Sequence, residues 1–258
     1  MKLVQNMQIC KFQNNRFINV CDEVIVEFPF EIYVNDEKLI TLMCTPNNLD
    51  YLAIGYLFSD GIINNYNDIE EIIINKDNNA FVYTKNKIDL TCKHSNRART
   101  SGCGNATMPD NYMDYIEEQV IVKNNITTKK IEEITNSLYE NSGLFLRTGG
   151  VHNTSLWNDK EMMMFHEDIG RHNTLDKIIG ESLVKNIELN DKIIYTSGRI
   201  SSEMLVKTAK AHIGTVISRS TVTNVAKEIA DELGITLIGF SRKNRFNIYS
   251  DKHKRILI

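Results

Sequence analysis

Long apolar runs are missing from this chain, and their absence narrows its class. No stretch reaches the ~18 apolar residues that a transmembrane helix needs. The N-terminal segment also lacks the apolar core of a signal peptide. We therefore expect a cytoplasmic protein that makes no use of a membrane.

A strong charge of either sign is missing too. The formal net charge is −3, so the composition does not point to nucleic acid or an anionic membrane as a partner. The five cysteines are odd in number and scattered, which disfavours a disulfide framework. Cys10, Cys21 and Cys44 lie in or beside ordinary segments, where we expect small packing residues.

Several catalytic signatures are also absent. The chain has no HExxH, and no cysteine follows position 103, so the Pro-Cys-x-x-Cys half of a zinc deaminase is missing. It has no GxSxG elbow, no Walker P-loop and no GxGxxG sequence. These absences disfavour a metal site, a Ser-His-Asp hydrolase and the common nucleotide-binding loops.

The densest cluster of polar groups lies in residues 145–177. This segment combines glycine turns with three of the six histidines and with several charged groups: Arg147, Gly149, Gly150, His152, His166, Glu167, Asp168, Gly170, Arg171, His172 and Asp176. Residues 162–165 predict a strand and residues 173–184 a helix. The turn between them would offer free N–H groups to an anion. The alternative is a polar turn with satisfied histidines.

The first ~90 residues predict a β-rich module. Residues 24–34 and 38–43 favour a hairpin, residues 47–58 a helix, and residues 69–74, 80–84 and 88–91 further strands. Residues 92–110 then lose all periodicity, which is typical of functional or disordered loops. Glycines flank Cys103, and nearby Arg97 and Arg99 favour its thiolate. We expect this loop to be mobile without a partner, because it has little apolar area to bury.

After a helix over residues 127–141, strands and helices alternate from Leu144 onward. We expect strands at 192–195, 215–218, 235–240 and 245–249, and helices at 201–212 and 223–233. This alternation predicts a largely parallel sheet with helices on its faces. Ligands of such sheets bind beyond the carboxyl ends of the strands. Physical reasoning alone therefore suggests a thiol-dependent protein that acts on a phosphorylated ligand.

Six motifs in linked order resemble the formate dehydrogenase accessory sulfurtransferase family, FdhD. They are CTPNNLDYLAIGYLFSDGII (44–63), RTSGCG (99–104), RTGGVH (147–152), EDIGRHNTLDK (167–177), TSGRISSEMLVK (196–207) and the segment 218–250. The resemblance covers nearly the whole chain except the first ~20 residues, and no single motif would suffice.

The resemblance implies a sulfurtransferase that receives sulfur as a persulfide from a cysteine desulfurase. It implies transfer of this sulfur to the bis(guanine dinucleotide) molybdenum cofactor, which matures formate dehydrogenase. It also implies a homodimer and a cytidine-deaminase-like α/β/α sandwich without zinc. We place the smaller β-rich domain at residues 20–92, the mobile cysteine loop at 93–110 and the cofactor-binding α/β domain at 111–258.

One departure from the family concerns the cysteine loop. Where the family commonly has Cys-x-x-Cys, this chain has Cys103-Gly104-Asn105-Ala106. One thiol can still carry a persulfide, but it cannot close a local disulfide. Cys92 could resolve such a step if the loop folds back. The alternative is a non-catalytic chaperone that binds the cofactor and has lost sulfur transfer.

The expected cofactor site combines cationic donors, backbone N–H groups and an aromatic side chain. Residues 240–245 match the family's nucleotide-contacting segment, and arginine can both bind phosphate and stack on a base. We expect no protein-ligated metal and one catalytic residue, Cys103. The predicted cofactor-binding residues are Gly150, His152, Asp168, Gly170, Arg171, His172, Ser197, Gly198, Arg199, Ser218, Arg219, Ser220, Phe240, Ser241, Arg242, Lys243, Asn244 and Arg245.

Overall fold

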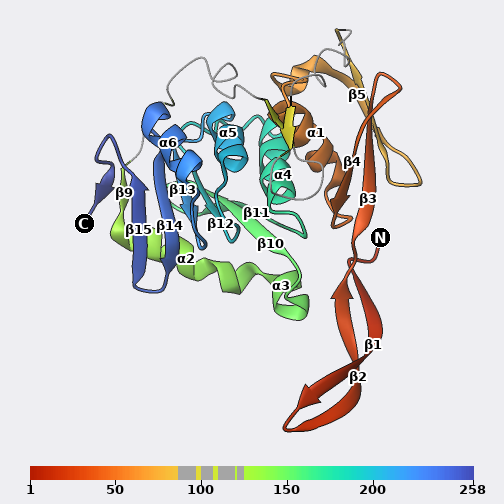
Figure 1. Ribbon diagram of the computed structural model, residues 1–258. Helices are drawn as coiled ribbons and strands as arrows, with labels where there is room; N and C mark the ends of the chain where they lie inside the picture. Colours follow the sequence, from red (N-terminus) through yellow and green to blue (C-terminus); the bar gives the residue numbers. More distant parts are fainter. Residues whose placement is uncertain (87–96, 100–106, 110–119, 121–124) are drawn as a thin grey trace.

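The chain folds into a body built on two sheets, from which a hairpin projects (Figure 1). This is a computed structural model that describes residues 1–86, 97–99, 107–109, 120 and 125–258. The expected strand at 88–91 and the Cys103 loop therefore lie outside the described residues. Among the described helices, none is both long enough and apolar enough to span a membrane.

A six-stranded sheet forms the centre of the larger half. Its order is β11-β10-β12-β13-β14-β15, with β10 (His152–Trp157), β11 (Met162–Asp168), β12 (Ile193–Thr196), β13 (Thr215–Ser218), β14 (Thr236–Arg242) and β15 (Arg245–Ser250). Only the β12–β13 and β13–β14 pairs are parallel. The prediction of a largely parallel sheet was wrong, because β10–β11 and β14–β15 are short-turn hairpins and such turns join antiparallel strands.

Helices cover both faces of this sheet and make three layers (Figure 1). They are α2 (Thr128–Asn141) and α3 (Gly143–Thr148) on one side, with α4 (Arg171–Val184), α5 (Ser202–Lys210) and α6 (Asn224–Leu233) on the other. Neighbouring strand residues serve opposite faces: Val216 joins the cluster that includes residues of α4, α5 and α6, and Ile217 joins the cluster of α2. Because successive side chains alternate between two faces that helices cover, the strands are apolar at successive positions. Resemblance to cytidine deaminases stays a prediction.

The helix boundaries agree closely with the sequence patterns. Thr127 caps α2 by accepting a hydrogen bond from the Lys130 N–H at 3.1 Å, as its position before the helix predicts. By contrast, residues 143–148 form helix α3, although a strand was expected from Leu144. The Glu167 carboxylate accepts the backbone N–H groups of Leu144 and Phe145, each at 2.9 Å, and so stabilises the start of this helix.

The second sheet and one helix form the smaller half. The sheet has the order β4-β3-β6-β5, with β3 (Phe28–Val34), β4 (Glu37–Cys44), β5 (Ile69–Ile74) and β6 (Ala80–Thr84). Helix α1 (Leu49–Ser59) follows β4, and a 3₁₀ turn (Tyr66–Asp68) precedes β5. The hairpin β3–β4 and the strands at 69–74 and 80–84 were predicted correctly. A single apolar cluster joins both halves. The predicted domain boundaries stay a prediction.

Three two-stranded sheets complete the described strands. They are β1 (Val4–Gln13) with β2 (Arg16–Ile25), β7 (Arg97–Arg99) with β8 (Thr107–Pro109), and β9 (Ile126–Thr127) with β16 (Ile256–Leu257). The β1–β2 hairpin was not predicted from the sequence. A single strand was expected over residues 24–34, whereas β2 ends at Ile25 and β3 begins at Phe28.

Helices α1 and α4 join the two halves at a crossing that requires glycine. A Cβ on Gly55 would lie 1.8 Å from the Asp176 carbonyl oxygen, and one on Gly180 would lie 2.0 Å from the Tyr51 oxygen. Each backbone therefore occupies the space that a side chain on the other helix would need. The two glycines therefore allow the backbones of α1 and α4 to pack in direct contact.

We predict that Gly55→Ala or Gly180→Ala lowers the free energy of unfolding by about 1–3 kcal/mol or more, as overpacking does in well-packed cores. Alanine's better helix propensity, worth about 1 kcal/mol, offsets only part of this. Urea denaturation followed by circular dichroism measures the change. Gly143→Ala is the control, because nothing lies within 4 Å of its Cβ position. Equal stability of all three variants would contradict the predicted clash.

Candidate functional site at the strand-end edge

Five strands place their polar turns at one edge of the large sheet. The parallel strands β12, β13 and β14 end there, and the antiparallel strand β10 begins there. Strand β11 also ends there, because His152 pairs with Asp168. The mixed sheet therefore brings together the turns that the sequence predicted, although two of its six strands, β10 and β15, run against the other four. We call this the strand-end edge.

Direct contacts join these turns in a row. His152 Nδ1 lies 3.3 Å from Ser197 Oγ, and the Ser218 hydroxyl donates to the Gly198 carbonyl at 2.7 Å. The Phe240 N–H donates to the Ser220 carbonyl at 2.7 Å. The row runs from β10 through β12 and β13 to β14. The polar turns that follow these strands therefore lie side by side at this edge.

Gly198 links the row to the start of α4. A Cβ on Gly198 would lie 2.8 Å from the Arg171 Cβ, so only glycine fits beside this side chain. Helix α4 starts without a side-chain cap on Gly170, and Arg171 and His172 are its first two residues. The first N–H groups of an uncapped helix attract anions.

Asp168 holds this turn from within the protein. Its carboxylate accepts hydrogen bonds from the backbone N–H groups of Thr45 and Gly170, from the Asn173 amide at 2.8 Å and from Lys177 Nζ at 2.6 Å. Asp168 and Lys177 are both 0% exposed. Through these contacts Asp168 positions the turn at Gly170. A direct role in binding the cofactor stays a prediction.

His172 is buried beside Arg171 and stays neutral. Burial, together with the nearby charges of Lys207 and Arg171, lowers the pKa of His172 to about 2. Glu203 Oε2 lies 3.3 Å from its Nε2 without forming a hydrogen bond, and neither ring nitrogen has a hydrogen-bond partner. Burial and Arg171 also lower the pKa of His152. A neutral imidazole can donate with one nitrogen and accept with the other.

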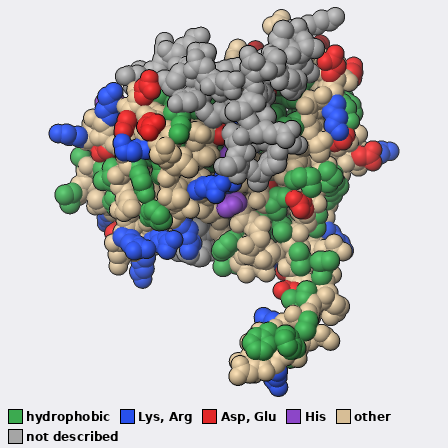
Figure 2. Space-filling view, viewed as in Figure 1, with side chains coloured by type: hydrophobic (Ala, Val, Ile, Leu, Met, Phe, Trp, Pro, Cys, Tyr) green, Lys and Arg blue, Asp and Glu red, His purple; other side chains and the backbone are tan. Residues whose placement is uncertain are grey.

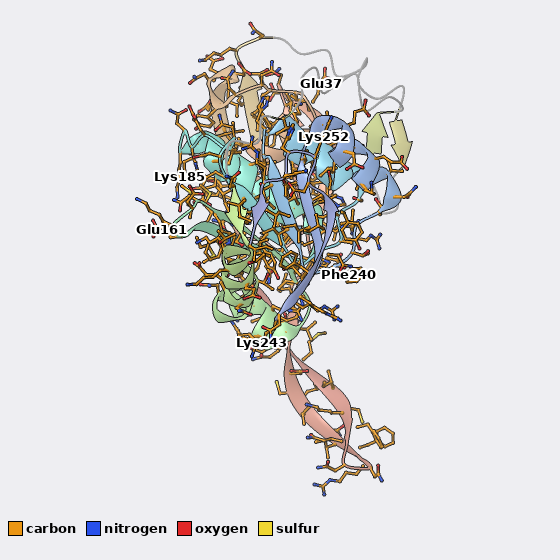
Figure 3. All side chains as sticks on the ribbon, turned by 90° about the vertical axis from the view of Figure 1, so that its left-hand side faces the viewer. Glu37, Glu161, Lys185, Phe240, Lys243 and Lys252 are labelled. Carbon is orange, nitrogen blue, oxygen red and sulfur yellow. The ribbon has the colours of Figure 1, made fainter. Side chains whose placement is uncertain are left out.

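The turn between β14 and β15 carries three exposed cations. Arg242, Lys243 and Arg245 are exposed, and Asn244 takes a left-handed φ of 65° in the turn. Figure 2 shows Lys and Arg side chains gathered where β14 and β15 join, and Figure 3 shows Phe240 and Lys243 along this hairpin. Phe240 is 36% exposed, so one part of its ring is open to a ligand.

Ser241 faces away from the exposed cations. It is 1% exposed and its hydroxyl bonds the Thr135 hydroxyl of α2. The predicted cofactor-binding role of this side chain stays untested, but a ligand at the turn would meet the cations rather than this hydroxyl. Arg199 is exposed and Arg219 half-buried, each directly after a strand-end turn.

The described cysteines do not include the candidate nucleophile. Cys103 and Cys92 lie outside the described residues. Cys44 is fully buried as expected, and burial followed by the charge of Asp168 raises its pKa to about 12. The expectation of packing residues was wrong for Cys10 and Cys21, which are exposed on the β1–β2 hairpin.

The three histidines of residues 145–177 do not form one site. His166 Nε2 lies 2.6 Å from Glu181 Oε2 on the C-terminal half of α4, away from the pair His152 and His172. Among the described residues, no group of three or more His, Cys, Asp or Glu could hold a metal ion.

Sequence reasoning missed the buried ions that support this edge. Besides Lys177, the Lys207 ammonium donates to Asp176 Oδ2 at 2.6 Å, and Ser59 donates to Asp176 Oδ1 at 2.7 Å. The available signal was Asp176 and Lys177, which fall at positions that α4 buries. Such charges are rarely buried unless paired.

Fold and edge together define an α/β protein with an anion-attracting row of turns beyond its strand ends. The sequence matches the FdhD/NarQ family over residues 25–257, and the chain belongs to that family. It is 38% identical to the sulfur carrier protein FdhD of Listeria innocua, over 97% of this chain and 98% of that protein. It is 39% identical to the protein of the same name from Geobacillus kaustophilus, over 96% of each chain.

A solved structure agrees with this assignment. The chain matches a crystal structure from Desulfotalea psychrophila, described as that of a candidate formate dehydrogenase accessory protein, with a TM-score of 0.83. The two are 25% identical, and the match covers 99% of this chain and 100% of that one.

Proposed function

We propose that this protein carries sulfur during the maturation of formate dehydrogenase. The observation that supports this most strongly is near-full-length similarity to proteins named sulfur carrier protein FdhD. The FdhD/NarQ family match excludes only the first 24 residues and the last. A cysteine desulfurase and formate dehydrogenase are the partners that this function requires. The homodimeric state and the cytoplasmic location stay predictions.

Cys103 is the proposed carrier of the sulfur as a persulfide. Its thiolate attacks the outer sulfur of a desulfurase persulfide; the new S–S bond forms as the old one breaks, and the desulfurase cysteine leaves as a thiolate. Delivery as sulfide then needs two electrons, which a thiol reductant supplies. Cys44 is a poor rival, because a buried thiol with a pKa of about 12 supplies almost no thiolate.

We predict that Cys103→Ala abolishes loading with sulfur. The protein is incubated with a cysteine desulfurase and ³⁵S-cysteine, and label that a thiol reductant releases is counted. We expect label on the wild type and none on Cys103→Ala. Cys10→Ala and Cys21→Ala are the matched controls, because both thiols are exposed but lie on the hairpin. Retained label on Cys103→Ala would exclude the persulfide role.

The proposed acceptor is the bis(guanine dinucleotide) form of the molybdenum cofactor, bound as a substrate at the strand-end edge. Its phosphates need cationic and N–H donors, and its guanine needs a flat partner. The exposed Arg242 and Arg245, the partly open Phe240 and the uncapped start of α4 offer these groups. A protein-ligated metal is not part of this proposal.

Ala106 supports a second candidate function. Without a second loop cysteine, the protein could bind the cofactor as a chaperone and transfer no sulfur. The two functions differ in one result: a chaperone supports dehydrogenase activity in cells when Cys103 is alanine, whereas a carrier does not. Cys92→Ala tests in addition whether Cys92 replaces the missing cysteine.

A further inference from the structure

The four-stranded sheet of the smaller half has one covered face and one open face. Figure 1 shows α1 on one side of this sheet and, among the described residues, no helix on the other. The face towards α1 holds the buried residues of β3 and β6, which are Phe30, Ile32, Val34, Ala80 and Val82. Tyr33 and Phe81 alternate with them and are only half-buried. We call the second face, on which these two rings lie, the open face.

A row of aromatic and apolar side chains crosses the open face. The strand registers place Ile73 of β5 opposite Phe81 of β6, and Phe81 beside Tyr33 of β3. Tyr33 in turn lies opposite Lys38 of β4, and side chains in register project to the same face. The rings of Tyr33 and Phe81 are stacked, with their centroids 4.7 Å apart. Ile73 is 42% exposed and Met43, at the end of β4, is 46% exposed. Exposed apolar groups gathered in this way mark interaction sites.

Carboxylates surround this row. The strands and turns of the sheet, residues 27–44 and 66–85, carry eight Asp or Glu and three Lys, whereas the whole chain has a net charge of only −3. Glu31 accepts hydrogen bonds from Lys38 and from the Tyr33 hydroxyl, the latter at 2.6 Å. These bonds hold the pKa of Glu31 below its ordinary value, so it stays charged at neutral pH. Glu70 and Glu71 of β5 are exposed.

The open face therefore suits a partner that is apolar in its centre and basic at its flanks. Nucleic acids and anionic membranes are negatively charged, and the carboxylates repel them. An extended peptide would add to an edge strand of the sheet rather than lie on its face. Sheet faces are buried against a second layer, and in the larger half of this protein helices form that layer on both faces. A helix is about 10 Å wide and so covers two to three strands at their spacing of about 4.8 Å.

We infer that the open face binds an amphipathic helix of a partner protein, one whose apolar stripe is flanked by lysine or arginine. The stripe packs on the stacked rings of Tyr33 and Phe81 and on Ile73. The basic flanks lie against the surrounding carboxylates, including those of Glu70 and Glu71. The strand-end edge belongs to the other sheet, so this contact uses none of the residues proposed for the cofactor. The inference is independent of the proposed sulfur transfer.

A model helix tests the inference on the full chain. The probe is a fluorescent peptide of about 18 residues, with leucine at helical spacing and lysine at the other positions. Fluorescence anisotropy at physiological salt should show binding in the micromolar range. The same peptide with glutamate in place of lysine should not bind. No binding of the lysine peptide to the wild type, or equal binding of both peptides, would overturn the inference.

Removal of the apolar row tests which side chains carry the contact. Ile73→Ser with Phe81→Ser should weaken binding of the lysine peptide by about 10-fold or more, because aromatic and large apolar anchors dominate such interfaces. Ile248→Ser is the control, since Ile248 is 52% exposed on β15 in the larger half. We expect the control to bind as the wild type does. Undiminished binding by the double variant would contradict the proposed position of the helix.

A charge exchange leaves the apolar row intact. Glu70→Lys with Glu71→Lys changes only exposed side chains, so it decides the matter if the serine variant does not fold. It should weaken binding of the lysine peptide by about 10-fold or more and allow the glutamate peptide to bind. Glu132→Lys with Glu133→Lys is the matched control, because it makes the same change at exposed positions of α2. Equal losses in both variants would assign the binding to net charge alone and overturn the inference.

Two further measurements separate the open face from other roles of the chain. Sedimentation velocity of the serine and charge variants should match that of the wild type. A changed oligomeric state would assign the open face to a second copy of the chain and overturn the inference. GDP affinity should be unchanged in both variants, because the proposed cofactor site lies on the other sheet. Failure of that site and failure of this inference are therefore distinguishable.

Discussion

Replacing Arg242 and Arg245 together with alanine is expected to weaken the binding of GDP by about 10²-fold or more. Charge-assisted hydrogen bonds contribute about 1.5–3 kcal/mol each, and two such losses multiply in the binding constant. Both side chains are exposed at the β14–β15 turn, and Arg242 pairs directly with Arg245 across the strands. Two like charges at this spacing repel each other, so a shared anion between them is favoured.

GDP is the suitable probe because it carries the base, ribose and phosphates of one half of the proposed cofactor. Isothermal titration calorimetry measures the affinity of the wild type and of the double variant. Lys252→Ala with Lys254→Ala is the control, since both lysines are exposed and the change removes the same charge. We expect the control to bind as the wild type does. Equal affinity of the arginine variant would exclude this turn and favour the arginines after β12 and β13.

The sequence predicted most elements because their causes are local. Apolar periodicity marked helices such as α6, and a threonine before α2 marked its first turn. The strand-end edge was also predictable, since polar turns with serine and arginine directly follow buried strands. Placement of these turns in one row needed only the rule that strand ends share an edge.

What the sequence did not predict depends on distant partners. Helix α3 begins where the Glu167 carboxylate meets two backbone N–H groups, 22 and 23 residues away in the chain. The antiparallel pairing of β10 and β11 follows from the short turn between them. The sequence pattern did not distinguish this turn from the strand-to-helix turns around it. The β1–β2 hairpin was missed because both of its faces carry apolar residues, so it lacks the clean alternation of a half-buried hairpin.

The buried ion pair under the edge was missed for a related reason. Asp168 and Lys177 were both inside a recognised motif, but only Asp168 was assigned a role, as a cofactor-binding residue. The structure shows that the lysine reaches three groups from different segments: Asp168, the Thr45 carbonyl at 3.3 Å and Asn47 Oδ1 at 2.9 Å. Helix periodicity cannot reveal this, because the partners at 45 and 47 belong to the other half of the body.

Lys177→Met is therefore expected to lower the free energy of unfolding by about 3–5 kcal/mol. The methionine keeps much of the volume but leaves the Asp168 carboxylate buried without its counter-ion, and such uncompensated charges are costly. Urea denaturation measures the loss. Lys185→Met is the matched control: it removes a lysine from the C-cap of the same helix, whose side chain is 50% exposed, and ion pairs open to solvent contribute at most about 1 kcal/mol.

The double variant Lys177→Met with Asp168→Asn separates the ion pair from simple packing. If the cost arises from the unpaired carboxylate, removing that charge should recover part of the stability lost in Lys177→Met, and the two single losses should not add. Additive losses would instead assign the effect to packing.

The Asp168–Lys177 pair also positions the turn from which Arg171 contacts Gly198, so GDP affinity should fall in Lys177→Met even where the protein is fully folded. Unchanged affinity in the folded variant would show that the turn keeps its shape without the lysine.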